Sequence, residues 1–290
     1  MDEGGQVTIR DATEADLAAV IEIAQATGQV EDWTTVFPEY VRHLIEHGRF
    51  LVGRHEHRVI GFGATRQIGA GPTAVSMLTD LFVDPAAHGT GTGRAILDAL
   101  WARQPRKMTF SSLHSNALPL YTSFGVDAWW PLLYLGGEVS RLRQPAGWSV
   151  ERAGTADVAA LELEWTGVDR TADHQMWAAR PSGASIIASR NGEPTAAGTA
   201  GGAGAEYGIN HLVVAGTGET DAGLAADAVI AALSFLDPSD GRAHVCLPAP
   251  HPAVRRLLAA GWKVSEFDLY MASEPGLIDP LSSVPSPDLA

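Results

Sequence analysis

Apolar and polar residues alternate along the first half of the chain with the periods of both helices and strands. From Glu14 onward, and again over 38–47, apolar side chains return every three or four positions, as on one face of an amphipathic helix. Apolar runs at 50–53, 59–66 and 75–83 are typical of strands joined in an antiparallel meander. The other predicted elements are strands at 7–10, 107–111 and 129–135 and helices at 91–101 and 117–124. This order predicts an α/β fold, a mixed sheet with flanking helices.

The sequence also contains an internal repeat. Residues 10–20, RDATEADLAAV, are echoed with one deletion by residues 152–161, RAGTADVAAL, and each copy predicts a threonine N-cap followed by a helix. Later correspondences keep the same order: DLFV at 80–83 with HLVV at 211–214, and 125–134 with 261–270 in spacing. The chain is therefore predicted to hold two copies of one domain in tandem.

The domain limits follow from the repeat and from the composition between its copies. We expect an N-terminal domain over 1–143 and a second copy over 146–274, joined through the Gly- and Pro-containing stretch 136–147. Residues 275–290, rich in Pro, Ser and Asp, are predicted to form a flexible tail.

Composition and charge narrow the classes of function. The formal net charge of -14 disfavours nucleic acid as a partner, because nucleic-acid affinity depends on Lys and Arg side chains that neutralise phosphates. The single cysteine, Cys246, excludes an intrachain disulfide. No apolar run reaches the roughly 18 residues of a membrane span, and the first residues lack the pattern of a signal peptide. These features predict a cytoplasmic protein with no membrane association.

A glycine-rich segment joins a predicted strand to a predicted helix at residues 88–94, HGTGTGR. Glycine tolerates positive φ and has no Cβ, so backbone N–H groups can converge on a ligand there. At a helix N-terminus such groups favour an anion. A dinucleotide fingerprint would need glycine in place of Arg94, and a P-loop would need Lys followed by Ser or Thr after the last glycine. A phosphate-bearing ligand of another kind, or a turn without a ligand, are the interpretations that remain.

The segment resembles the coenzyme A motif of the GNAT superfamily of N-acyltransferases, Arg/Gln-x-x-Gly-x-Gly/Ala after a strand ending in Val-Asp-Pro. His88 stands where the family has Arg or Gln, whereas Gly91 and Gly93 match. Downstream, NALPLYTSFG at 116–125 resembles the family stretch Asn-x-x-Ala-x-x-Leu-Tyr-x-x-x-Gly-Phe, with Pro119 at the alanine position. The resemblance implies two tandem GNAT-like domains and acetyl-CoA as cosubstrate.

Carried over position by position, the resemblance assigns roles to individual residues. Tyr121 would protonate the departing thiolate, Asn116 would help to hold the pantetheine arm, and the backbone of Val83 would polarise the thioester carbonyl. The residues expected to bind the coenzyme are Leu81, Phe82, Val83, His88, Gly89, Thr90, Gly91, Thr92, Gly93, Arg94 and Asn116.

An amine acceptor must lose a proton before it attacks a thioester, so the reaction also needs a base. Strand alternation puts Asp80 on the same face as Phe82, and Asp80 is the candidate; a solvated or salt-bridged aspartate is the alternative. Asp32 and Trp33, where the family has its substrate loop, and Trp129 are candidates for acceptor binding, with core packing as the alternative for the two tryptophans.

The sequence HLIEH at 43–47 fits a short zinc motif, since His43 and His47 share a helix face. A catalytic zinc needs a third ligand, and none is marked, so no metal is expected.

The second copy lacks the features that carry this chemistry. Glu219 and Asp221 stand where the first copy would hold an anion, and Leu257 and Pro252 take the positions of Tyr121 and Asn116. The second domain is therefore expected to be degenerate and not to bind coenzyme A.

Together these patterns predict an N-acetyltransferase that moves an acetyl group directly from acetyl-CoA to the primary amine of a small molecule. A mycothiol-synthase-like acyltransferase, which in the family also has a tandem architecture, is the enzymatic alternative. A coenzyme A binding sensor without turnover is the alternative from another class. An aminoacyl-tRNA-dependent transferase of double GNAT-like fold is disfavoured by the acidity of the chain.

Overall fold

The computed structural model describes residues 7–28, 37–202, 207–216, 222–238 and 240–290. The chain divides into two compact units, Met1–Thr109 and Phe110–Ala290, called unit 1 and unit 2 below. This division falls earlier than the predicted limit at residues 143–146, so the repeats read from the sequence and the compact units are not the same segments. Each unit is described by itself.

Unit 1 is built on a sheet whose strands run in the order β1-β2-β3-β4-β5. The strands are β1 (Thr8–Asp11), β2 (Arg49–His55), β3 (Arg58–Ile68), β4 (Val75–Val83) and β5 (Lys107–Ser111), whose last residues belong to unit 2. The first four strands are antiparallel neighbours, while β4 and β5 run parallel. The meander predicted from the apolar runs is therefore present.

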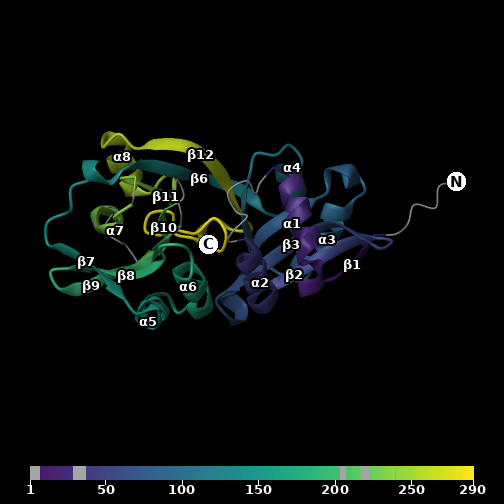
Figure 1. Ribbon diagram of the computed structural model, residues 1–290, viewed down its shortest axis with the longest axis horizontal. Helices are drawn as coiled ribbons and strands as arrows, with labels where there is room; N and C mark the ends of the chain where they lie inside the picture. The colour runs from purple at the N-terminus through teal and green to yellow at the C-terminus, as the bar shows by residue number, and fades with distance from the viewer. Residues whose placement is uncertain (1–6, 29–36, 203–206, 217–221, 239) are drawn as a thin grey trace. The chain divides into compact units, whose positions relative to one another are not determined.

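Helices cover both faces of this sheet: α1 (Leu17–Ala26) and α2 (Phe37–His47) on one side and α3 (Thr92–Trp101) on the other (Figure 1). The approach of α3 depends on glycine, because a Cβ on Gly63 of β3 would lie 2.8 Å from the Ile96 Cγ2 atom. The three-four spacing of apolar residues in α3 fits this contact, since Ile96, Leu97 and Leu100 are all buried.

Strand β4 carries the two irregularities that position the candidate site. Its pairing with β3 shifts at Thr79, between the pairs Ala64↔Asp80 and Thr65↔Leu78, which is a β-bulge. Its parallel pairing with β5 ends at Leu78↔Thr109. Beyond that point, no described strand pairs with β4 on its β5 side as far as Val83.

Unit 2 has the strand order β12-β6-β11-β10-β9-β8-β7. The strands are β6 (Asp127–Glu138), β7 (Trp148–Ala153), β8 (Ala184–Arg190), β9 (Glu193–Gly201), β10 (Gly208–Val214), β11 (Arg242–Pro248) and β12 (Lys263–Ala272). The helices are α4 (Ala117–Thr122), α5 (Thr155–Thr166), α6 (Thr171–Ala178), α7 (Ala222–Phe235) and α8 (Pro252–Ala259). Strand β6, predicted to close the first domain, lies between β12 and β11 in the sheet of unit 2 (Figure 1).

The two repeats have the same irregularities at corresponding positions. In β10 the pairing with β9 shifts between Ile209 and His211, so Asn210 is the bulge residue as Thr79 is in β4. The parallel pairing of β10 with β11 ends at Ile209↔Val245. The tandem architecture predicted from the echoed sequence segments is therefore visible in the backbone.

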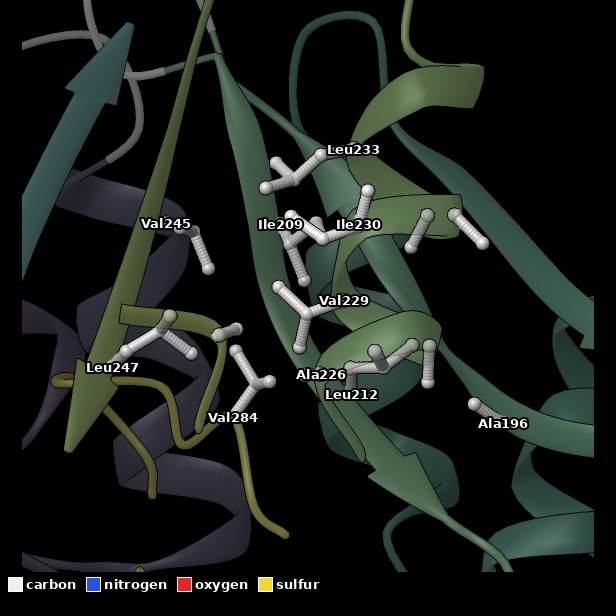
Figure 2. Packing of buried hydrophobic residues seen from close by; sticks show 14 of the residues in the cluster. Ala196, Ile209, Leu212, Ala226, Val229, Ile230, Leu233, Val245, Leu247 and Val284 are labelled. Carbon is white, nitrogen blue, oxygen red and sulfur yellow. The ribbon is translucent and has the colours of Figure 1, made fainter. Parts of the chain in front are cut away.

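An apolar core lies in unit 2 around α7 (Figure 2). Ala226, Val229, Ile230 and Leu233 of this helix are all buried and pack on the sheet, where Ile209 of β10 is one neighbour. Small alanine side chains along α7 let the helix lie close to the strands.

The C-terminal segment differs from the predicted flexible tail. Val284 and Leu289 are fully buried, Val284 belongs to the core of unit 2, and the segment pairs with β10 through the bridge Leu212↔Val284. The prediction was wrong because it rested on the Pro and Ser content of the segment. These residues disfavour regular secondary structure, but the apolar side chains between them can still pack in a core.

Short 3-10 turns complete the described chain: η1 (Glu14–Asp16), η2 (Gly71–Thr73), η3 (Pro85–Ala87), η4 (Val139–Arg141) and η6 (Pro275–Leu277). Within the described ranges, no helix combines the length and the apolar character that a membrane crossing requires.

Candidate active site

The turn between β4 and α3 is fixed by its sequence. Asp84 ends the strand, and its side chain accepts a hydrogen bond from the Ala86 amide at 2.9 Å, which starts η3. Gly89 and Gly91 follow with φ of +81° and +82°, in the left-handed region that other residues rarely adopt. A Cβ at either position would meet open space, so these glycines are needed for their backbone angle.

The first turn of α3 presents amide donors beside these glycines. The first helical hydrogen bond runs from the Ala95 amide to the Gly91 carbonyl at 3.0 Å. The amides of Thr92 and Gly93 precede that bond, so they have no acceptor within the helix. With the positive end of the helix dipole added, this turn has the form of an anion site.

Strand β4 offers a polar edge on its β5 side. The Asp84 amide donates to the Ile60 carbonyl of β3 at 2.9 Å, and successive N–H groups of a strand point to opposite edges. The N–H groups of Val83 and Leu81 therefore point away from β3. No strand in the described part of the chain pairs with this edge beyond Leu78. Such an edge can bind the amides of an extended ligand as a further strand would.

Asp80 lies on the opposite face of the sheet from α3, toward α2. It is 7% exposed, and one of its carboxylate oxygens accepts a hydrogen bond of 2.7 Å from the Tyr40 hydroxyl. The sequence did not reveal Tyr40 as a partner. Its burial follows from the helix spacing that it shares with Val41 and Leu44, but the contact with Asp80 depends on how α2 crosses the sheet. The ring of Phe82, on the same face, lies 5.2 Å from that of Phe62.

His88 stands in the turn where the family motif has Arg or Gln. The side chain is exposed, and its Nε2 atom lies 3.1 Å from the Val83 carbonyl oxygen. The Thr90 hydroxyl donates to the Ala87 carbonyl at 2.8 Å and lies 2.7 Å from that of Thr92. These bonds hold the turn in the shape that exposes its amides, and Arg94 is exposed one residue further on.

Asn116, Tyr121 and Trp129 belong to unit 2. Asn116 is the exposed N-cap residue of α4, and Tyr121 on the same helix is 8% exposed. Trp129 of β6 is 42% exposed, and its indole N–H donates to the Ala272 carbonyl at 3.1 Å. Of the three, Tyr121 is thus buried, whereas Asn116 and Trp129 are exposed.

Two acceptor-site candidates, Asp32 and Trp33, lie outside the described residues, as do Glu219 and Asp221 of the second copy. His43 and His47 are described, with ring centroids 4.9 Å apart. Among the side chains that the structure places, no group of three or more His, Cys, Asp or Glu is arranged to hold a metal ion.

A pocket of about 650 Å³ lies in unit 1 at the ends of β2 and β3. The residues that line it are Arg10, Ala15, Asp16, Ala19, Glu22, Ile23, Ala26, Arg54, His57, Arg58, Val59 and Asp84. Two ion pairs form among these residues: Arg10 with Asp16 at 2.6 Å, and Arg58 with Asp84. The hydrogen bond from Arg10 lowers the pKa of Asp16 to about 2. The first pair joins β1 to η1, and the second joins β3 to Asp84 at the start of the glycine turn.

Comparisons with known proteins agree with this geometry. Residues 46–126 match the family model of the acetyltransferase (GNAT) domain, a span that covers β2 to α4 and includes the glycine turn. The comparison with curated proteins gives no match.

Solved structures resemble the chain over nearly its whole length. A Pyrococcus horikoshii protein shares 15% identity at a TM-score of 0.69, covering 100% of this chain and 96% of its own. A tandem GNAT protein from the clavulanic acid biosynthesis pathway shares 14% identity at a TM-score of 0.60, with coverage of 94% and 100%. A GCN5-related N-acetyltransferase from Kribbella flavida shares 18% identity at a TM-score of 0.61, and the match covers 92% of this chain and 71% of its own. Residues 46–126 thus match a GNAT acetyltransferase domain, and the fold of the chain is similar to that of a tandem GNAT protein.

Proposed function

We propose that the chain is an N-acetyltransferase that moves an acetyl group directly from acetyl-CoA to the primary amine of a small molecule. The observation that supports this most is the polar edge of β4 beyond Leu78, which leads to the first turn of α3. Members of the superfamily bind an acyl-CoA in general. The pantetheine arm of an acyl-CoA is extended and carries amides, which can pair with the N–H and C=O groups along the β4 edge. Its pyrophosphate end would then lie at the anion site in the first turn of α3.

The residues of unit 1 supply binding and polarisation in this proposal. The amides of Thr92 and Gly93 would hold the pyrophosphate. Gly91, the N-cap residue of α3, would allow this through its left-handed backbone conformation. The Val83 N–H, which points away from β3, would donate to the thioester carbonyl and stabilise the charge that develops on its oxygen. The Leu81 backbone would bind the amides of the arm.

Asp80 would take the proton of the acceptor ammonium, directly or through water. Its burial and its hydrogen bond from Tyr40 hold the carboxylate in place on β4. Tyr121, from unit 2, would give its hydroxyl proton to the departing sulfur. The carbon–nitrogen bond then forms as the carbon–sulfur bond breaks, and the products are an amide and the free thiol.

The test is thiol release from acetyl-CoA in the presence of a panel of primary amines, with the acetylated product identified by mass. Asp80→Asn should lower kcat by about a hundredfold or more, because a general base is removed while the shape is kept. Asp98→Asn, at an exposed position of α3, is the matched control and should leave kcat unchanged.

The outcome also separates the alternatives. Turnover only with an amino-thiol sugar conjugate would favour a mycothiol-synthase-like enzyme. Saturable coenzyme A binding without turnover on any amine would favour a sensor and would refute the proposed reaction.

A further inference from the structure

The pocket of unit 1 lies on the α1 side of the sheet, whereas the glycine turn leads into α3 on the other side. A Cβ on Gly53 of β2 would lie 2.9 Å from the Thr92 Cγ2 atom, so Gly53 faces α3. Neighbouring residues of a strand point to opposite faces, which places the Arg54 side chain on the α1 side, in the wall of the pocket. The volume of about 650 Å³ is in the usual range of ligand sites.

The wall of this pocket combines apolar surface with charged groups. Its apolar part consists of Val59 of β3 and of residues that recur every three or four positions along η1 and α1: Ala15, Ala19, Ile23 and Ala26. Its three arginines and three carboxylates balance one another, so the pocket has no net charge when His57 is neutral.

Two of the three carboxylates already have cationic partners. Asp16 pairs with Arg10 and also accepts hydrogen bonds from the amide and the hydroxyl of Thr13, at 2.9 and 3.0 Å. Asp84 pairs with Arg58. These two carboxylates are therefore satisfied by groups of the protein itself.

Arg54 and Glu22 are the charged residues of the wall that remain. A guanidinium has five N–H donors, and Arg54 uses one of them, from Nη2 to the His57 carbonyl at 3.0 Å. Among the residues that the structure describes, no carboxylate pairs with Arg54 and no cation pairs with Glu22. Within the described chain, the pocket thus offers an unpaired cation and an unpaired anion on the two sides of an apolar surface, β2 and α1.

We propose that this pocket binds a small zwitterion, a molecule with a carboxylate and an ammonium group on an apolar body, as in an amino acid. The Arg54 guanidinium binds the carboxylate through its fork of N–H groups. The Glu22 carboxylate binds the ammonium group, and the alanine-rich wall packs against the apolar body. A zwitterion keeps the pocket electrically balanced, which a ligand of one charge does not. The inference does not rest on the acetyl transfer proposed above.

The first experiment is calorimetry on the full-length chain with two zwitterions, L-leucine and 6-aminohexanoate, which differ in the spacing of their charges. Hexanoate, which lacks the ammonium group, and hexylamine, which lacks the carboxylate, are the matched controls. We expect at least one zwitterion to bind saturably, about threefold tighter than hexanoate and about tenfold tighter than hexylamine. Absence of saturable binding by both zwitterions, or equal binding of the controls, would overturn the proposal.

Charge variants then test the mode of recognition with the zwitterion that binds. Arg54→Gln should weaken its binding about tenfold or more, because the ligand carboxylate loses its partner. Glu22→Gln should weaken it about threefold, because an ion pair at an exposed position contributes less. Arg152→Gln and Glu151→Gln, at exposed positions of β7 in unit 2, remove the same charges elsewhere and should change nothing. Unchanged affinity in folded Arg54→Gln would contradict the proposal.

A pair of helix variants tests the place of binding without changing a charge. Ala19→Phe puts a ring into the pocket and should weaken zwitterion binding about tenfold or more. Ala18→Phe makes the same change at the neighbouring position, which is exposed and outside the pocket wall, and should leave binding unchanged. Equal effects of the two substitutions would show that the ligand does not lie against α1.

The Gly91→Asp variant separates this pocket from the proposed coenzyme site. The substitution lies in the glycine turn before α3, on the other side of the sheet, so zwitterion binding should stay within about twofold of the wild type. Loss of binding in folded Gly91→Asp would place the ligand at the glycine turn and overturn the proposal. None of these measurements needs turnover, so an inactive enzyme would leave this test intact.

Discussion

One position after the β-bulge, the two repeats carry different side chains with different partners. Asp80 accepts a hydrogen bond from a tyrosine of α2, whereas His211 donates to the carboxylate of Glu162. Burial alone would raise the pKa of Glu162, but His211 and the hydrogen bond from His174 outweigh it and lower that pKa. One repeat thus has a carboxylate beside an open strand edge, and the other has a buried hydrogen-bond network of Glu162 with two histidines beside a filled one.

Tyr121 gives the first prediction at the scale of a residue. Replacing it with Phe removes the proposed acid and keeps the ring that packs at this buried position. We expect kcat to fall about a hundredfold, at the low end for a general acid, because a thiolate is a good leaving group. The affinity for acetyl-CoA, measured by calorimetry, should stay within about twofold.

The control for Tyr121→Phe is a measurement of the chemical step by single-turnover kinetics. If the variant keeps more than half of the wild-type rate with chemistry limiting, Tyr121 is a packing residue and the proton comes from elsewhere.

Among the elements, the sequence predicted those whose apolar period is strong and whose ends carry turn residues. The β2–β3–β4 meander and α3 agree with the prediction within a few residues, because Gly, Pro and Asp mark their ends. The α1–α2 face of the site was less predictable. The bond from Tyr40 to Asp80 depends on a helix crossing that no local pattern encodes, and Asp32 and Trp33 lie outside the described residues.

The glycine turn gives a prediction at the scale of an element. Gly91→Asp introduces both an unfavourable left-handed angle and a negative charge beside the proposed phosphate site. We expect coenzyme A binding to weaken by at least about a hundredfold in calorimetry. Gly71→Asp is the matched control, because Gly71 also has positive φ and open space around it but lies in the β3–β4 turn.

Equal loss of affinity in the two glycine variants would mean that backbone strain, and not the phosphate site, explains the effect. An unchanged dissociation constant in Gly91→Asp would refute the assignment of the turn.

Helix α8 in unit 2 provides a pH-dependent prediction. His251 is its N-cap, 1% exposed, and the imidazole Nδ1 atom accepts a hydrogen bond from the Ala253 amide at 3.2 Å. Burial lowers the pKa of His251 to about 4. The unfolded chain takes up a proton on this residue at higher pH than the folded chain does. The stability that His251 contributes is thus present above about pH 6.5 and is lost as the pH falls toward 4.

His251→Asn keeps a side-chain oxygen that can cap the helix and removes the titrating group. Urea unfolding at pH 7.5 and pH 4.5 should show that the variant gains about 1–3 kcal/mol relative to the wild type on going to the lower pH. His57→Asn, at an exposed histidine of unit 1, is the control. An equal pH response of His251→Asn and the wild type would contradict the assignment.

At the scale of the whole chain, the sequence predicted the repeat but not how the strands of the two copies are distributed between the two units. The echo of residues 10–20 in 152–161 predicted two similar folds, and the matching bulges at Thr79 and Asn210 bear out that tandem architecture. The placement of β6 in unit 2 and the burial of Val284 both result from contacts between segments that are far apart in the sequence. Local sequence patterns do not determine such contacts. The loss of the phosphate site in the second copy was inferred from residues 219–221, which lie outside the described part of the chain.

The filled edge of unit 2 is a second, independent reason to expect that unit 2 binds no coenzyme A. An acyl-CoA arm on β10 would have to displace the pairing of Val284 with Leu212, the apolar contacts of Val284 and the ion pair of Asp288. We therefore expect calorimetry to give one acetyl-CoA per chain in the wild type and none in Gly91→Asp. The second measurement is the sharper one, because a site in unit 2 would survive that substitution. If folded Gly91→Asp still bound acetyl-CoA saturably, at about half the number of molecules per chain that the wild type binds, the expectation would be wrong. A coenzyme would then bind at β10 and displace Val284.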